Sequence, residues 1–121
     1  MNALDQEEIL RLTVLSKERL TKKVKKFSEL INVDYGRITI RHQRTRWGSC
    51  STKGNLNFNC LLMLTPEYVQ DYVVVHELAH RKEMNHSSKY WSIVESVLPD
   101  YKDAKKWLKE NGKELIQRMD A

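Results

Sequence analysis

The stretch from His76 to His86, HELAHRKEMNH, holds three of the four histidines of this chain. Residues four apart project from the same face of a helix, so His76 and His80 can direct their imidazoles at one metal ion. Glu77 then lies beside the ion, where a general base is needed. His86 follows six residues after His80, which lets the chain leave the helix, turn and return a third nitrogen.

Three protein ligands leave the fourth tetrahedral position of zinc open for water, which distinguishes a catalytic zinc site from a closed structural one. Zinc lowers the pKa of its bound water to near ~7, so Glu77 can take the proton and pass it to a leaving amine. The sequence therefore predicts one Zn²⁺ on His76, His80 and His86, with Glu77 as the general base of a peptide-bond hydrolase.

One rival exists for the third ligand. Glu95 lies fifteen residues after His80, and both histidine and glutamate occur in catalytic zinc sites. We favour His86 because its loop is short, and interpret Glu83 as a solvated carboxylate or a partner of a ligand. His42 is interpreted as a surface histidine, and Trp47 and Trp91 as core residues. Residues that could orient a substrate or stabilise the oxyanion are Tyr35, Asn59, Tyr72 and Tyr90.

The helix that carries the first two ligands has a clear start signal. Thr65 is expected to be its N-cap, with Pro66 at the first helical position and Glu67 in the first turn. The helix is expected to end near Met84–Asn85, before the third histidine. One stripe combines core residues with ligands, so the site should be built into the fold: Val69, Val73, His76 and His80.

Before this helix, the pattern predicts a covering helix followed by strands. Apolar residues recur at helical spacing from Leu4 to about Ile31, as one helix or as two with a break near residues 13–17. Alternation predicts a strand at 37–41. Two more strands, 46–51 and 55–60, are joined by a tight turn with Gly54 at positive φ, and the asparagines of the last strand should share a face that is exposed or functional.

After the histidines, Ser87 or Ser88 can cap a further helix that ends at Pro99. Another helix is expected from Tyr101 to Glu110, with Asn111–Gly112 as its stop and a short final helix in residues 113–121. Whether this C-terminal tail covers the cleft is left open.

Length and composition place the chain among ordinary soluble globular domains, with 121 residues, 40% of them hydrophobic and 31% charged. We expect one domain, residues 1–121, with a covering helix in 1–35 and a catalytic core in 36–121. The longest apolar run, Cys60–Leu64, is too short to span a bilayer, and the N-terminus lacks a signal peptide. A cytoplasmic location follows as the expectation, with Cys50 and Cys60 as reduced thiols.

The net charge of +5 is concentrated in residues 17–26 and 37–46. Such segments can make weak contact with nucleic acid, although a solvated face is commoner. Two alternatives to a simple peptidase follow: a DNA-associated protease acting on DNA-bound proteins, and a non-catalytic zinc-stabilised interaction domain. The intact Glu77 and the three-ligand site argue against the second. Peptides or proteins are the expected substrates, no membrane is expected as a partner, and the oligomeric state is open.

A series of motifs occurs in a fixed order along the chain: RWGSC at 46–50, GNLNFN at 54–59, Pro66, YVVVHELAH at 72–80, NHS at 85–87, Trp91 and PDY at 99–101. Together these motifs resemble the YgjP-like metallopeptidase family, which is similar to the SprT and WLM zincin proteases. The resemblance spans roughly residues 37–108 and implies a minimal zincin fold, zinc on the three histidines, Glu77 as general base, and the strand of residues 47–51 near the cleft. The histidine spacing equals that of the metzincins, but Glu83 takes their glycine position and no methionine turn follows.

The expected fold is therefore an α+β minimal zincin-like domain. It should contain an N-terminal helix, a small three-stranded and mostly antiparallel sheet, the HExxH helix and C-terminal helices. A peptide is expected to add as an extra strand along the sheet edge near Gly48–Cys50.

Overall fold

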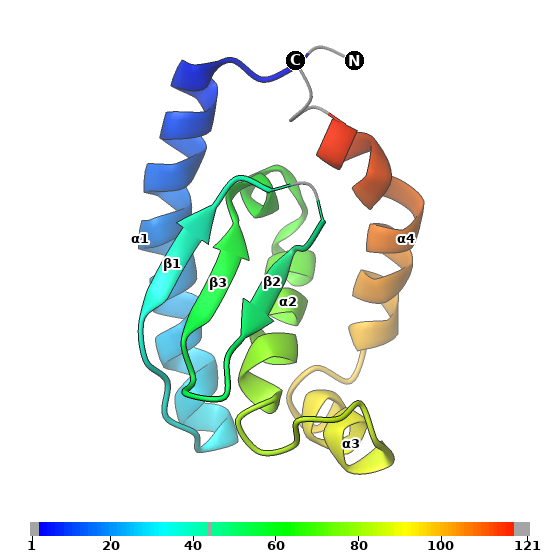
Figure 1. Ribbon diagram of the computed structural model, residues 1–121. Coiled ribbons are helices and arrows are strands. Elements are labelled where there is room, and N and C mark those ends of the chain that lie inside the picture. The colour runs from blue at the N-terminus through cyan, green and yellow to red at the C-terminus, as the bar shows by residue number, and fades with distance from the viewer. Residues whose placement is uncertain (1–2, 44, 118–121) are drawn as a thin grey trace.

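The computed structural model describes residues 3–43 and 45–117, and it confirms an α+β fold of helices around a small three-stranded sheet (Figure 1). Its elements, in chain order, are α1 (Gln6–Ile31), β1 (Ile38–Arg41), β2 (Gly48–Cys50), β3 (Leu56–Asn59), the 3₁₀ helix η1 (Cys60–Leu64), α2 (Glu67–Ala79), α3 (Ser88–Val97) and α4 (Tyr101–Gln117).

The N-terminal segment is one helix of 26 residues, without a break near residues 13–17. Asp5 caps it, because its side chain accepts a hydrogen bond from the Glu8 amide at 2.8 Å. Asn32 ends it in the left-handed conformation, with φ of 63°. The buried face of α1 packs on α2 and η1, and its largest side chains are Leu20, Val24, Phe27 and Ile31.

The sheet has the order β1-β3-β2, with β2 antiparallel and β1 parallel to β3. The expectation of a mostly antiparallel sheet is thus met by one of the two pairings. The turn from β2 to β3 is tight, and a tight connection permits only antiparallel neighbours. Gly54 has the expected positive φ, at 86°. β3 lies between β1 and β2. Because these two outer strands run in opposite directions, β3 is parallel to one of them and antiparallel to the other.

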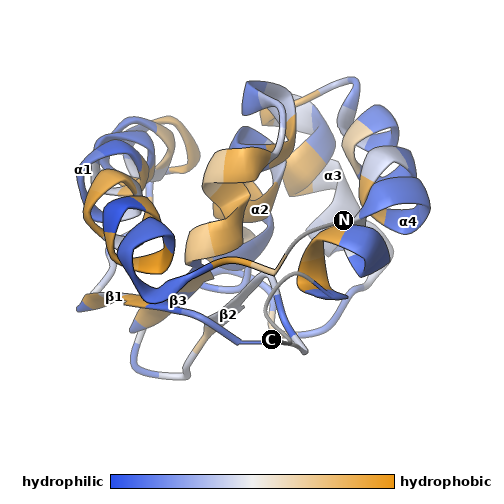
Figure 2. Cartoon of the chain, turned by 90° about the horizontal axis from the view of Figure 1, so that it is seen from above, coloured by the Kyte–Doolittle hydropathy of each residue, from blue (hydrophilic) through white to orange (hydrophobic). Residues whose placement is uncertain are grey.

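Seen from above, α1 and α2 lie side by side over one face of the sheet, and α4 lies next to α2 on the β2 side (Figure 2). The core fills the space between α1, α2 and the sheet, and β3 contributes Leu56 and Phe58, both fully buried. The asparagines of β3 do not all share an exposed face as expected, because Asn59 is also fully buried. The reason lies in its hydrogen bonds, described with the site below.

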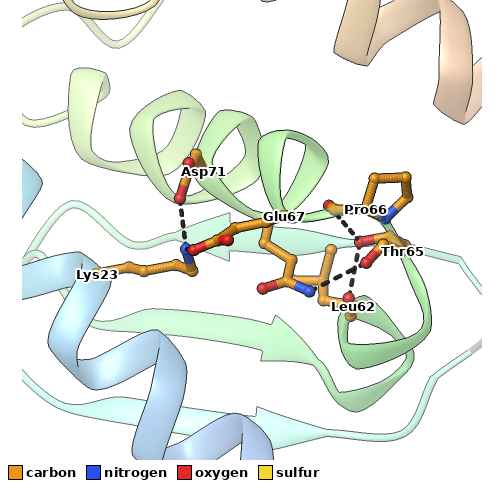
Figure 3. Close-up of polar contacts among 7 residues, drawn as sticks. Lys23, Leu62, Thr65, Pro66, Glu67 and Asp71 are labelled. Atoms are coloured by element: carbon orange, nitrogen blue, oxygen red, sulfur yellow. Dashed lines mark hydrogen bonds and ion pairs between the residues drawn. The ribbon is translucent and has the colours of Figure 1, made fainter.

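The ends of α2 differ from expectation. Thr65 is not its N-cap, because the Thr65 hydroxyl donates a hydrogen bond backward to the Leu62 carbonyl at 2.7 Å, and the cap position is taken by Pro66. Figure 3 shows this contact. The helix also ends about a turn early, at Ala79. The following amides tighten into i→i+3 bonds, such as Arg81 N to Leu78 O at 3.0 Å.

The last two helices include one confirmed and one wrong boundary. Ser87 caps α3, as its hydroxyl accepts from the Tyr90 amide at 3.3 Å. The expected stop at Asn111–Gly112 is wrong, since α4 continues to Gln117. A Cβ on Gly112 would meet the Trp47 ring at 3.4 Å. That distance is an ordinary van der Waals contact, so Gly112 is a buried position inside α4, beside Trp47, rather than a helix end. The rest of the expected final helix, 118–121, lies outside the described residues.

Two further observations concern membrane-spanning helices and the cysteine thiols. Within residues 3–43 and 45–117, no helix is both long enough and apolar enough to cross a membrane. Cys50 and Cys60 are both free thiols. Burial raises the pKa of each thiol, so both are inert rather than reactive at neutral pH.

Candidate metal centre

Three imidazoles converge where α2 meets the loop that leads to α3. One nitrogen from each of His76, His80 and His86 lies within 4.8 Å of the others. Although α2 ends before His80, this residue keeps right-handed helical angles, with φ of −64° and ψ of −15°. The i, i+4 relation between the first two histidines is therefore preserved. The early end of the helix gives the chain room to turn and bring the third ring back.

The donor set fits a zinc ion. Nδ1 of His80 lies 3.2 Å from the main-chain oxygen of Glu83. That acceptor favours a proton on Nδ1 and leaves the Nε2 lone pair for a metal. Nδ1 of His76 lies 3.0 Å from Glu77 Oε2, with the same consequence. Partial burial, together with the neighbouring imidazoles, lowers the pKa of His86 and favours the neutral form that a metal requires.

The ring of Tyr90 packs against all three imidazole rings. It is fully buried, its ring stacks on His80 with centroids 4.7 Å apart, and it meets His86 edge-on at 4.8 Å. Its hydroxyl donates to the His76 carbonyl at 2.5 Å. Burial, followed by the charge of Glu77, raises the pKa of Tyr90 and keeps this hydroxyl protonated. Tyr90 is thus structural, and the expectation that it might orient a substrate is not met.

The other residues of α3 settle two expectations. Trp91, expected in the core, is only half-buried and stacks on His86 with centroids 5.9 Å apart. Glu95, the rival third ligand, is exposed and stands outside the histidine cluster. The short loop brings His86 to the first two ligands, whereas α3 directs Glu95 elsewhere.

Glu77 lies under β2. Only 6% of Glu77 is exposed, and a Cβ added to Gly48 would come within 3.1 Å of its Cγ. Because Gly48 has no side chain, β2 can pack directly against the turn of α2 that carries Glu77. Such a position favours a base that is shielded from bulk water yet next to the three imidazoles.

A hollow of about 260 Å³ opens beside Glu77 and His76, between β2, α2 and α4. This hollow, called the cleft below, borders the histidine cluster through His76. Of the candidate substrate-orienting residues, Tyr72 lines this hollow. Its ring meets His76 edge-on at 5.6 Å, and burial raises its pKa. Tyr35 packs against the core instead. The complete lining is Arg46, Trp47, Gly48, Tyr72, Val73, His76, Glu77 and Leu108.

Asn59 is occupied by the backbone. Its side-chain amide donates to the carbonyls of Gln43 at 2.7 Å and Arg46 at 3.0 Å, and its oxygen accepts from the Leu61 amide at 3.0 Å. No oxyanion role is left for it, which corrects the expectation. These bonds explain why a polar residue is fully buried at the end of β3: it fixes the segment that precedes β2 and carries the cleft residues Arg46 and Trp47.

The basic residues of α1 lie away from the histidines. A hollow of about 720 Å³ between α1, η1 and α2 is lined by Arg19, Lys22, Lys23 and Lys26. The Lys23 ammonium is already paired with Asp71 at 2.7 Å and Glu67 at 2.9 Å (Figure 3). Lys22 lies 3.7 Å from the Glu18 carboxylate, so within the described residues only Arg19 and Lys26 of this hollow have no ion pair. His42, at the other basic segment, is exposed as expected.

Comparisons with known proteins agree with this geometry. The family model described as YgjP-like, metallopeptidase domain, matches residues 7–111. The crystal structure of the metallopeptidase zymogen of Pyrococcus abyssi abylysin has a TM-score of 0.67 and 22% identity, covering 75% of this chain and 93% of that chain. The zymogen of Methanocaldococcus jannaschii jannalysin has a TM-score of 0.66 and 18% identity, covering 75% and 94%. Both confirm the fold. Among curated protein sequences, none matches.

Proposed function

Because the chain belongs to the YgjP-like metallopeptidase family, we propose that it is a zinc-dependent peptidase that holds the ion on His76, His80 and His86. The observation that carries this proposal is the convergence of three imidazole nitrogens within 4.8 Å, next to the buried carboxylate of Glu77. Three neutral imidazoles with one open position suit zinc in a hydrolytic role.

In this mechanism, Glu77 is the general base. When bound, zinc polarises a carbonyl and makes water a stronger acid. Glu77 accepts a proton from the attacking water and delivers it to the nitrogen of the leaving amine. Burial under β2 keeps the carboxylate in place, and the hydrogen-bond acceptors of His76 and His80 hold both rings in one orientation.

The substrate is proposed to bind as an additional strand on β2. This strand lies at the edge of the sheet, because β3 is its only partner among the residues that the structure describes. A peptide lying there would use main-chain hydrogen bonds, which select for an extended conformation rather than for particular side chains. The hollow next to Glu77 would receive the side chain that is closest to the scissile bond.

Metal removal tests the proposed function. Chelator-treated protein, shown to be metal-free by elemental analysis, is expected to lose all hydrolysis of a mixed peptide library followed by mass spectrometry. One equivalent of Zn²⁺ should restore cleavage, whereas Mg²⁺ or Ca²⁺ should not, because these ions prefer oxygen ligands. Hydrolysis by the verified metal-free protein would overturn the proposal.

A second candidate is a peptidase that acts on DNA-bound proteins, favoured by the hollow lined by α1 cations. Each lost phosphate contact lowers the slope of log K against log salt by about 0.7 for a single strand. The triple variant Arg19→Gln, Lys22→Gln, Lys26→Gln should thus reduce this slope by about 2 in anisotropy titrations of a labelled oligonucleotide.

The matched control has the same charge change on α4: Lys102→Gln, Lys106→Gln and Lys109→Gln, all exposed. It should leave the slope of the parent protein unchanged. No binding of the parent at low salt, or equal slopes for both triple variants, would remove this candidate.

A further inference from the structure

The residues that line the small hollow at the candidate metal centre include one arginine, Arg46, and no lysine. The segment that carries Arg46 is held firmly. Asn59 donates to the Arg46 carbonyl at 3.0 Å, and the Asn59 amide donates to the Trp47 carbonyl at 3.0 Å. On the far side, the Trp47 ring packs closely against Gly112 of α4. The backbone at the base of the Arg46 side chain is therefore fixed at the rim of the cleft.

The guanidinium is available to a ligand. Within residues 3–43 and 45–117, no ion pair or side-chain hydrogen bond engages Arg46, and the residue is exposed. The only carboxylate among the residues that line the hollow is Glu77, which already contacts His76 Nδ1 at 3.0 Å. A planar guanidinium that none of these described residues engages suits bidentate recognition of a carboxylate.

The remainder of the lining limits the shape of the ligand. Trp47, Val73 and Leu108 provide apolar walls, and the volume of about 260 Å³ suits one side chain or chain end rather than an extended segment. Since the same hollow includes His76 and Glu77, a group bound there belongs to a residue adjacent to the scissile bond.

We propose that Arg46 is a specificity-determining residue that recognises a substrate carboxylate adjacent to the scissile bond. The carboxylate is either the side chain of an acidic residue or the C-terminus of the peptide. This inference rests on the proposed peptidase function and names the substrate class of its cleft. Arg46 contributes charge-assisted hydrogen bonds to the ligand, while the apolar walls contact its methylene groups.

Three matched peptides distinguish the two sources of the carboxylate. One has glutamate on either side of the cleavable bond, one is neutral with a free C-terminus directly after that bond, and one is neutral and amidated. At least one carboxylate peptide is expected to exceed the neutral peptide in kcat/KM by about tenfold, the value of one charge-assisted contact of about 1.4 kcal/mol. Equal values for all three would overturn the inference while leaving the peptidase proposal intact.

Two variants test the residue itself. Arg46→Gln should reduce the preference to within about twofold, and Arg46→Glu should invert it toward a peptide with lysine at the same position, because the contact is one of charge. Arg37→Gln, an exposed arginine that does not line the hollow, is the control and should keep the parent preference. A preference retained in Arg46→Gln would contradict the assignment.

A binding measurement separates this inference from failure of the peptidase proposal. A bound metal would itself attract carboxylates, so the metal-free protein is titrated with N-acetylglutamate and N-acetylglutamine amide, and tryptophan fluorescence is followed because Trp47 lines the hollow. Tighter binding of the glutamate in the parent, lost in Arg46→Gln, supports the inference even without turnover. Identical titrations for the two ligands would count against it.

Discussion

Replacing Glu77 by glutamine is expected to reduce peptide hydrolysis by about 10²–10⁴-fold, the usual contribution of a positioned general base. The glutamine amide is nearly the same shape and can still accept a hydrogen bond from His76 Nδ1, 3.0 Å from Glu77 Oε2 in the parent. The variant should therefore fold and bind zinc as the parent does, measured by elemental analysis. Only the ability to accept a proton is lost.

Glu83→Gln is the matched control for this experiment. The contact of Glu83 with His80 uses its main-chain oxygen, which the substitution leaves in place, so activity should be close to that of the parent. If Glu77→Gln were as active as Glu83→Gln, Glu77 would not be the general base. If it lost its zinc instead, the carboxylate would be needed to hold the metal rather than to move a proton.

Replacing His86 by alanine is expected to lower zinc affinity by more than about 100-fold, because loss of a partner that merely orients a ligand already costs 10–100-fold. His86 completes a cluster of three nitrogens. Without it, only two imidazoles, both at the end of one helix, would remain to hold the ion. Competition with a chromogenic chelator measures the affinity. The parent is expected to show a zinc-dependent rise in melting temperature, because an ion that binds the folded state alone stabilises that state. This rise should disappear in the variant.

Glu95→Ala provides the comparison. This side chain is exposed on α3 and lies outside the histidine cluster, so zinc affinity and the thermal shift should equal those of the parent. The opposite pattern, with zinc lost in Glu95→Ala and kept in His86→Ala, would show that the third ligand is the carboxylate. The two variants together decide between the ligands that the sequence leaves open.

The family assignment and the coarse fold follow from the sequence, and so do several local features. The positive φ of Gly54 and a serine cap of α3 at residue 87 or 88 follow from the sequence, and the structure confirms the first and selects Ser87 for the second. Each depends on residues within a single turn. The same holds for the shared face of His76 and His80, which the helical repeat fixes. Thr65 shows the limit of such signals, since its hydroxyl bonds backward to Leu62 rather than forward to the helix.

Features that join distant segments were not readable from the sequence. Gly112 resembles a helix stop, but in the folded chain it lies inside α4 and packs beside Trp47, which is far away in the sequence. The spacing of Asn59 predicts a place on an exposed strand face. In the folded chain the residue is buried, and its side-chain amide donates hydrogen bonds to the carbonyls of Gln43 and Arg46. In both cases a tertiary contact outweighs a local preference.

The sequence by itself determined the residue types of the candidate site: two histidines and a glutamate on one helix face, with His86 and Glu95 as candidate third ligands downstream. Only the tertiary structure decided how the site is completed, by bringing His86 rather than Glu95 to the cluster, placing Tyr90 beneath the rings and closing the hollow with α4. The physical reason is the distance along the chain over which each kind of interaction acts. Helical periodicity and capping act within a few residues, whereas the shape of the cleft depends on packing between elements whose relative positions no local pattern specifies.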